Sequence, residues 1–201
     1  MSDDPPGIDE KLRDELLAMD AEDQRIRREL LDAGLLGGGY HPRMEDVHKR
    51  NAARLKEIIA KDGWPGRSVS GERGAFAAWR IAQHAIGDPA FQRFCLRLLE
   101  EAVRSGDVSP HHPAYLLDRI RMYEGKPQIY GTQFMPNEEG DLAPWKIEDL
   151  PHVDERRAAI GLPPLAEMLH KPDPSSRPAS AKLEAWQREY EEWLRKAGWR
   201  T

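Results

Sequence analysis

His84 is the residue of this sequence best suited to proton chemistry. It lies near the end of the segment 75–86, in which nearly every residue is apolar or small, so the segment is predicted to be a helix buried on most sides. An imidazole titrates near neutral pH, and the dipole at the C-terminal end of a helix favours its protonated form. These properties suit a general acid or base. We therefore predict that His84 is the proton-transfer residue.

The predicted central helix carries two further polar side chains beside His84. Arg80 and Gln83 are three residues apart, and Arg80 is four residues before His84, a spacing that places all three on one helical face. A helix with one polar stripe ordinarily exposes that stripe to water. The alternative is that the stripe lines a cavity, in which Gln83 would contact a substrate.

Two polar residues interrupt apolar stripes elsewhere. Asp23 lies between Met19 and Ile26, where the spacing of the first predicted helix calls for an apolar residue, and Asn51 interrupts the second predicted helix in the same way. A buried polar group without a partner costs about 1–3 kcal/mol. These side chains are therefore interpreted either as structural hydrogen bonds between helices, as exposed residues on a shifted stripe, or as parts of a shared polar pocket.

Other polar side chains are predicted to share the pocket of His84. Asp23 or Asp118 would set the tautomer of the imidazole, and Arg119 would hold an anionic group. An aspartate and an arginine placed like Asp118 and Arg119 are, however, more often a solvated pair. The predicted catalytic residues are His84, Asp118 and Asp23, and the predicted substrate-binding residues are Gln83, Gln92, Arg119, Tyr130 and Gln133.

The motifs of several enzyme classes are absent. The sequence has no His-Glu-x-x-His, Cys-x-x-Cys, Gly-x-Ser-x-Gly or Gly-x-Gly-x-x-Gly motif. The histidines other than His84 are scattered along the chain, so we predict no metal site and no cofactor. Cys95 lies on an apolar stripe and is predicted to be a small buried residue rather than a nucleophile.

Composition limits the partners. The chain has 201 residues, of which 39% are hydrophobic and 32% charged, and its net charge is -5. This composition excludes a membrane span, and the lack of basic excess argues against nucleic acid as the main partner. With a single cysteine and no secretory signal at the N-terminus, we expect a cytoplasmic protein.

The periodicity predicts a mainly α-helical fold around the central apolar helix. Helices are expected over 8–33, 44–61, 75–86, 88–106 and 110–123, followed by a small β-hairpin over 128–134 and 143–147 and by short helices at 154–160 and 164–170. The predicted divisions are an N-terminal helix with a glycine joint (1–39), a helical core domain with the hairpin (40–170), a proline-rich linker (171–178) and a C-terminal helix (179–201).

The last predicted helix has an aromatic face. Trp186, Tyr190 and Trp193 recur in steps of four and three residues, and this face is too apolar to remain in water. The face therefore has to dock on another surface. A protein partner, or a second copy of the chain, is one prediction for that surface.

Several sequence blocks resemble an uncharacterised bacterial domain family of unknown function. The blocks include 63–66 (GWPG-type turn), 83–85 (QHA), 88–92 (DPAFQ), 115–119 (YLLDR) and 128–133 (QIYGTQ), and the resemblance extends from about Leu12 to Leu169. The family carries no assigned reaction, so the resemblance implies only a place to look for a site. Residues in its blocks include Gln83, His84, Gln92, Asp118, Arg119 and Gln133.

Two functions are consistent with the sequence. The first is a hydrolase or lyase that binds a small polar or anionic molecule in a pocket between the central helix and the hairpin. The second is a non-catalytic binding or accessory protein that acts through its terminal helices, and such a protein needs no catalytic histidine.

Overall fold

The computed structural model describes residues 7–36, 40–169 and 180–201. Seven α-helices and one two-stranded antiparallel hairpin lie in these ranges, which confirms the predicted mainly helical fold with a C-terminal helix. Within the described part of the chain, none of the helices has both the length and the apolar character that crossing a bilayer requires.

The chain divides into two compact units, Met1–Ser109 and Pro110–Thr201. The predicted glycine joint at 37–39 and the proline-rich linker at 171–178 lie outside the described residues, so the predicted divisions of the chain stay predictions.

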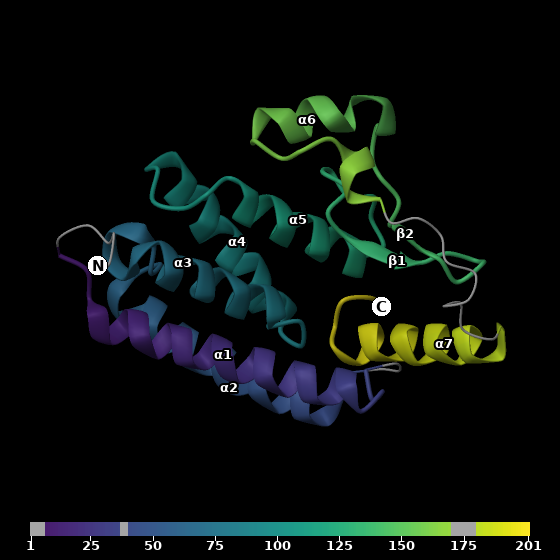
Figure 1. Cartoon of the computed structure of the whole chain (residues 1–201), viewed down its shortest axis with the longest axis horizontal. Coiled ribbons are helices and arrows are strands. Elements are labelled where there is room, and N and C mark those ends of the chain that lie inside the picture. The colour runs from purple at the N-terminus through teal and green to yellow at the C-terminus, as the bar shows by residue number, and fades with distance from the viewer. Residues whose placement is uncertain (1–6, 37–39, 170–179) are drawn as a thin grey trace. The chain divides into compact units, whose positions relative to one another are not determined.

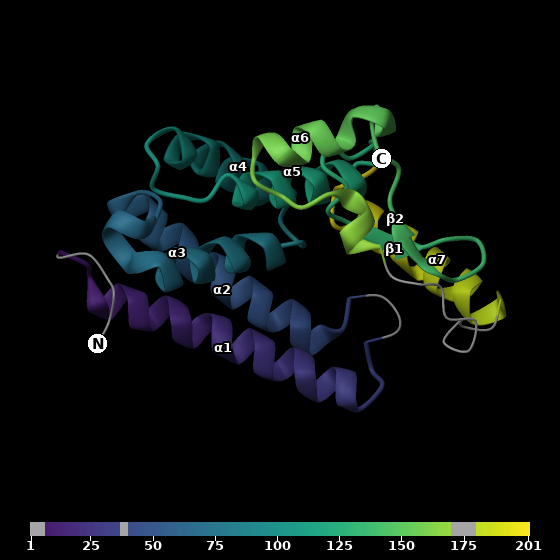
Figure 2. The same ribbon diagram turned by 45° about the horizontal axis from the view of Figure 1, so that its top comes forward.

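The first unit consists of four helices: α1 (Glu10–Asp32), α2 (Pro42–Asp62), α3 (Arg67–His84) and α4 (Pro89–Arg104). Helices α1 and α2 run antiparallel side by side, and α3 packs against both (Figures 1 and 2). The buried apolar side chains of this unit include Leu16, Leu30, Val47, Leu55, Ile81 and Leu99.

Helix α1 buries the stripe that its sequence predicts, including the two carboxylates on it. Asp9 caps the helix by accepting a hydrogen bond from the backbone amide of Leu12. Asp20 and Asp23 are 7% and 1% exposed. Asp23 is therefore not an exposed residue, which was one of the interpretations of its place on the stripe. A buried carboxylate needs hydrogen-bond or ionic partners inside the unit.

Helix α3 begins earlier than its apolar pattern predicts, at Arg67. The backbone amides of Arg67 and Ser68 donate to the backbone carbonyl and side chain of Asp107, which closes the start of the helix. Gly71 then interrupts the helix with φ 69°, a conformation that glycine adopts without strain. The capping carboxylate lies 39 positions later in the chain, so no local pattern could indicate it.

Helix α4 begins at the predicted signal. Asp88 accepts a hydrogen bond from the amide of Phe91 at 2.9 Å and forms an ion pair with Lys56 Nζ at 2.6 Å. Burial raises the pKa of this carboxyl, but the Lys56 ammonium and the Phe91 amide lower it more, so the net pKa lies below its ordinary value.

Replacing Asp88 by asparagine should make stability less sensitive to acid. Because the folded pKa is lowered, the ionised carboxylate stabilises the fold above the unfolded pKa, and this contribution is lost as the pH falls through the folded value. Asparagine keeps the cap but not the charge. The wild type should exceed the variant by about 0.5 kcal/mol at neutral pH, and the difference should vanish in strong acid when both are unfolded with urea. A difference independent of pH would contradict this origin.

The second unit contains α5 (His111–Tyr123), strands β1 (Phe134–Pro136) and β2 (Leu142–Pro144), α6 (Val153–Ala159) and α7 (Ser180–Lys196). Short 3-10 helices η1 and η2 span Leu150–His152 and Leu165–Met168. The antiparallel hairpin pairs Phe134 with Pro144 and Pro136 with Leu142.

The hairpin is shorter than predicted, because residues 128–133 form a loop rather than a strand. Apart from one bridge between Gln128 and Ile147, the amides of this segment do not join a sheet. Those of Ile129, Tyr130 and Thr132 instead donate to the carboxylate of Asp118 in α5. A side chain on a helix thus replaces the partner strand that the prediction required.

Helix α7 packs its aromatic face inside its own unit. The ring of Tyr123 in α5 lies 5.4 Å from that of Trp193 and 5.1 Å from that of Trp199. Arg200 Nε donates to the carbonyl of Tyr123 at 2.9 Å. The surface on which the C-terminal helix docks is therefore α5, so the aromatic face itself does not require a second protein.

Candidate functional site

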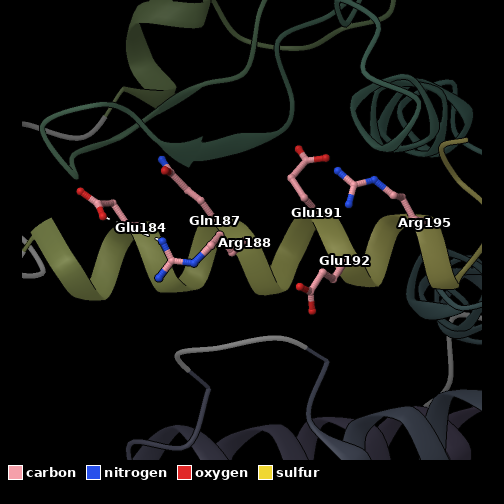
Figure 3. Close-up of a pocket in the computed structure, with 6 residues that line it drawn as sticks. All are labelled: Glu184, Gln187, Arg188, Glu191, Glu192 and Arg195. Carbon is pink, nitrogen blue, oxygen red and sulfur yellow. Dashed lines mark ion pairs between the residues drawn. The ribbon is translucent and has the colours of Figure 1, made fainter.

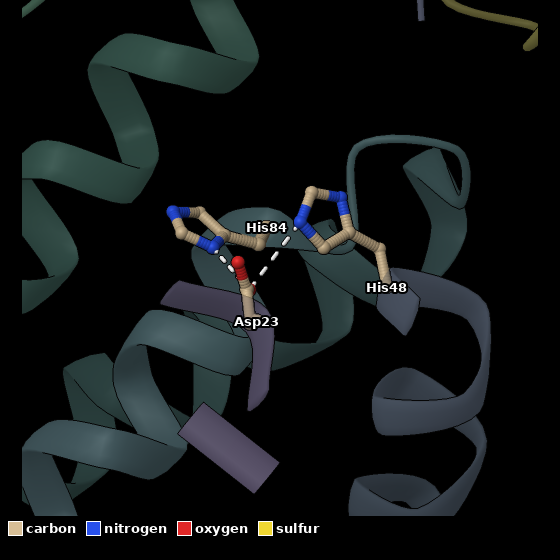
Figure 4. Close-up of side chains that lie close together, drawn as sticks. All are labelled: Asp23, His48 and His84. Carbon is tan, nitrogen blue, oxygen red and sulfur yellow. Dashed lines mark hydrogen bonds and ion pairs between the residues drawn. The ribbon is translucent and has the colours of Figure 1, made fainter. Parts of the chain in front are cut away.

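Three ionisable side chains from three helices meet inside the first unit (Figure 4). Asp23 of α1 places its Oδ2 2.6 Å from Nδ1 of His84 in α3 and 3.3 Å from Nε2 of His48 in α2. The two imidazole rings are 5.1 Å apart. We call these residues the Asp23–His48–His84 cluster.

Polar contacts near the cluster fix the three helices that carry it. Asn51 Nδ2 of α2 donates to the carbonyl of Met19 in α1 at 3.1 Å. One turn before the Asp23–His84 contact, Arg80 of α3 forms an ion pair with Asp20 of α1. Asn51 thus has the role of a structural hydrogen bond between helices, which was one interpretation of its place on the apolar stripe.

The carboxylate of Asp23 is charged although it is almost fully enclosed. Burial raises its pKa, but the adjacent imidazoles of His48 and His84 lower it more, so the net pKa lies well below the ordinary value. Its second oxygen, Oδ1, is buried and has no hydrogen-bond partner among residues 7–36, 40–169 and 180–201. An enclosed anion of this kind favours whatever positive charge the two imidazoles or a bound ion can supply.

His48 is the member of the cluster that the sequence did not predict. Its side chain is 8% exposed, and its Nδ1 lies 2.6 Å from the hydroxyl oxygen of Tyr40. Its Nε2 faces Asp23 at ion-pair distance but has no hydrogen-bond partner in the described part of the chain. The sequence offered one signal: His48 precedes Asn51 by three residues and so shares its helical face.

Two predicted substrate-binding residues belong to the first unit: Gln83 lies in the last turn of α3, and Gln92 lies in α4. Gln92 Nε2 donates to the carbonyls of Ala82 and Gln83 at 2.8 and 2.9 Å, which holds the last turn of the helix that ends at His84. Gln83 is 3% exposed and Gln92 is fully buried. The Gln92 side chain therefore holds the backbone next to His84 in place.

The other predicted residues belong to the second unit and contact one another. Asp118 is fully buried and accepts hydrogen bonds from three backbone amides and the hydroxyl of Thr132. Arg119 Nε donates to Gln133 Oε1 at 3.2 Å, and the carbonyl of Tyr130 accepts from Arg157 Nη1 at 2.6 Å. These contacts order the loop 128–133. The sequence analysis offered Asp23 or Asp118 as the residue that sets the tautomer of His84. Asp23 contacts His84, whereas the oxygens of Asp118 accept hydrogen bonds from this loop.

Two surface pockets lie in the second unit. One, of about 360 Å³, follows the exposed side of α7, and charged or amide side chains line it (Figure 3). The other, of about 310 Å³, is lined by aromatic, methionine and proline side chains together with Gln187, Glu191 and Arg200. Neither pocket contains a group of the Asp23–His48–His84 cluster.

Cys95 is not a candidate nucleophile. Its side chain is fully buried, as the sequence predicts, and burial raises the pKa of its thiol far above the ordinary value. The thiolate that nucleophilic catalysis needs is therefore not formed near neutral pH.

The family comparison covers the residues of the cluster. A model of DUF6624, a family of unknown function, matches residues 10–173. The chain belongs to this family. The match begins with α1 and continues beyond η2, so all three cluster residues lie within the DUF6624 region. It confirms the resemblance to a family of unknown function that the sequence blocks indicated. No curated protein and no solved structure matches the chain.

Proposed function

We propose that this DUF6624 protein is a hydrolase or lyase that acts on a small polar or anionic molecule at the Asp23–His48–His84 cluster. The observation that carries the proposal is the 2.6 Å contact between His84 Nδ1 and a carboxylate that is only 1% exposed. Perturbed ionisable groups held together inside a fold are typical of catalytic sites. A cytoplasmic location belongs to the same proposal.

The cluster supports proton transfer through His84. The charged Asp23 accepts the Nδ1 proton, which directs the lone pair to Nε2 and stabilises the imidazolium once a proton is taken up. In hydrolysis, Nε2 would take a proton from water as the water oxygen attacks, and return it to the leaving group. In elimination, it would take the proton from a substrate carbon, the C–H electron pair would form a double bond to the neighbouring carbon, and the leaving group would depart from that carbon. The side chain of His84 retains 19% of its exposure, which gives a small molecule access.

The substrate-binding roles predicted for Gln83 and Gln92, which lie in the same unit as the cluster, are kept as part of this proposal. What supports them is that an amide side chain can both donate and accept hydrogen bonds. The roles predicted for Arg119, Tyr130 and Gln133 stay predictions from the sequence. Asp118 is not needed for orientation of His84, because Asp23 makes that contact.

A His84→Asn variant tests the proposed function. Wild-type protein is assayed against small esters, amides, phosphomonoesters and hydroxy acids, and turnover of one class should fall by about 10²–10⁴-fold in the variant. His152→Asn is the control, because His152 is 58% exposed and pairs only with Asp149 among the contacts described. Unchanged turnover by a folded His84→Asn protein would refute the proposed centre.

A second candidate is a non-catalytic binding protein that acts through the end of α1. Leu31 and Leu35, in and just after this helix, are 61% and 53% exposed. Exposed leucines that lie close together favour contact with another apolar surface. If this function applies, light scattering should give a mass above that of one chain, and the double variant Leu31→Lys, Leu35→Lys should reduce it to a single chain.

A further inference from the structure

We propose that the Asp23–His48–His84 cluster binds one divalent transition-metal cation of the zinc type. This inference rests on the proposed function, because it concerns the same centre, and it adds a metal cofactor to that centre. The sequence analysis predicted no metal, because the histidines are scattered along the chain, and the proposal differs from that prediction. Folding brings two of these histidines to one carboxylate.

The donor atoms suit such a cation. One donor atom from each of the three residues lies within 4.8 Å of the other two. Asp23 Oδ2 is 2.6 Å from His84 Nδ1 and 3.3 Å from His48 Nε2. Around a tetrahedral zinc ion, with bonds of about 2.0–2.2 Å, neighbouring ligand atoms lie about 3.3–3.5 Å apart. Small side-chain movements would therefore bring the three atoms to one ion. Two imidazoles and one carboxylate are a donor set that zinc and its neighbours accept, and one that magnesium and calcium disfavour.

Burial and charge give an independent reason for a cation. His48 Nε2 and Asp23 Oδ1 are both buried without hydrogen-bond partners in the described residues, and their side chains are 8% and 1% exposed. The cluster holds one carboxylate and two side chains that carry no charge in their neutral form, so a cation is the complementary partner of the buried Asp23. A bound cation would neutralise the charge of this carboxylate and would give His48 Nε2 the partner that it lacks.

The outer contact of His48 is of the kind that supports a metal ligand. A histidine that binds a metal through Nε2 carries its proton on Nδ1 and usually donates it to an oxygen. Tyr40 places its hydroxyl oxygen 2.6 Å from this Nδ1. Because a tyrosine hydroxyl both donates and accepts, the same contact serves His48 with and without a metal.

A bound cation would change how the proposed reaction begins. Three protein ligands leave a fourth position for water, and zinc lowers the pKa of such a water to about 7. The water proton would pass to solvent, since His84 would then be a ligand and not a base. The hydroxide would add to the carbonyl carbon or phosphorus of an ester, amide or phosphoester. The bond to the alkoxide or amine leaving group would break, and that group would take a proton from solvent, so the proposed hydrolytic class of reaction is kept.

Metal titration tests the inference. Full-length protein is stripped with a chelator and titrated with Zn²⁺ and with Co²⁺ by calorimetry, and each should bind at one equivalent per chain. His48→Ala should weaken the affinity by more than 100-fold, beyond the 10–100-fold that loss of an outer-shell contact causes. His41→Ala is the control, because His41 caps α2 through its contact with the amide of Arg43. Circular dichroism establishes that both variants are folded.

Imidazole NMR gives a result that does not depend on a variant. On addition of Zn²⁺, the ring nitrogens of His48 and His84 should shift together, while those of the exposed His152 should not. Absence of binding to the folded wild type, or binding that His48→Ala leaves unchanged, overturns the proposal.

Two different experimental results distinguish failure of the metal proposal from failure of the proposed function. Turnover that survives complete removal of metal, but not His84→Asn, retains the enzyme and overturns the cation. One equivalent of zinc bound at His48 and His84 without turnover of any substrate class retains the cation and overturns the enzyme.

Tyr40→Phe tests the outer contact of the centre. Loss of the hydroxyl leaves Nδ1 of His48 without the oxygen that fixes its proton, so zinc affinity should fall by about 10–100-fold while the stoichiometry stays at one. The calorimetric titration measures both quantities. An unchanged affinity would show that Tyr40 does not support His48 as a ligand.

Discussion

Replacing Asp118 by alanine is expected to destabilise the unit Pro110–Thr201 by about 3–5 kcal/mol. The fully buried carboxylate accepts hydrogen bonds from the amides of Ile129, Tyr130 and Thr132 and from the Thr132 hydroxyl. Each buried donor that loses its partner costs about 1–3 kcal/mol, and water entering the vacated space recovers part of the sum. No other single side chain described in this unit accepts as many backbone hydrogen bonds.

Hydrogen exchange measures this effect at the donors themselves. In the wild type, the amides of Ile129, Tyr130 and Thr132 should be protected, and Asp118→Ala should remove protection from all three. Asp154→Ala is the matched control, since Asp154 accepts one backbone hydrogen bond, from Leu165, and should cost about 1 kcal/mol. Equal destabilisation by the two variants would contradict the assigned role of Asp118.

Asp23→Asn is expected to lower both turnover and zinc affinity by more than 100-fold without unfolding the protein. Asparagine keeps the shape of the side chain but removes the charge that stabilises an imidazolium or a cation. The effect should exceed that of Tyr40→Phe, because Asp23 contacts the imidazoles directly whereas Tyr40 acts through His48. Calorimetry and the substrate assay measure the two losses separately.

Asp20→Asn is the control for Asp23→Asn. Asp20 lies on the same helix, is 7% exposed and pairs with Arg80, so its replacement removes the same charge one turn away from the imidazoles. It should change stability but leave turnover and zinc affinity within a few-fold of wild type. If the two variants behave alike, the charge of Asp23 has no special role in the centre.

Most of the fold could be predicted because local signals set it. The apolar spacing of α1, the Asp88-Pro89 signal at the start of α4 and the glycine after α5 each act within a few residues. The early start of α3 could not be predicted, because Asp107 caps it from 39 positions away. The loop at 128–133 has the alternation of a strand, and only its contact with Asp118 in α5 makes it a loop.

Two of the three residues of the candidate site could be predicted from similar local anomalies. Asp23 interrupts an apolar stripe and His84 ends an apolar helix, so each was recognisable from its own helix. His48 adjoins the buried Val47 but belongs to a charged stretch, 45–50, in which a histidine resembles a surface residue. Its burial depends on contacts with α1 and α3, and within α2 the only indication of that burial is the helical face that His48 shares with Asn51.

The origin of the cluster in three different helices provides a way to find its ligand before any reaction is known. Asp23, His48 and His84 come together only when α1, α2 and α3 are packed, so a molecule or ion that needs all three binds the native chain and not the denatured one. Such selective binding raises the melting temperature as the free ligand exceeds its dissociation constant. A thermal-shift screen of metal ions and small anions, run in parallel on wild type and His48→Ala, would therefore identify compounds that occupy the cluster by the difference between the two melting curves.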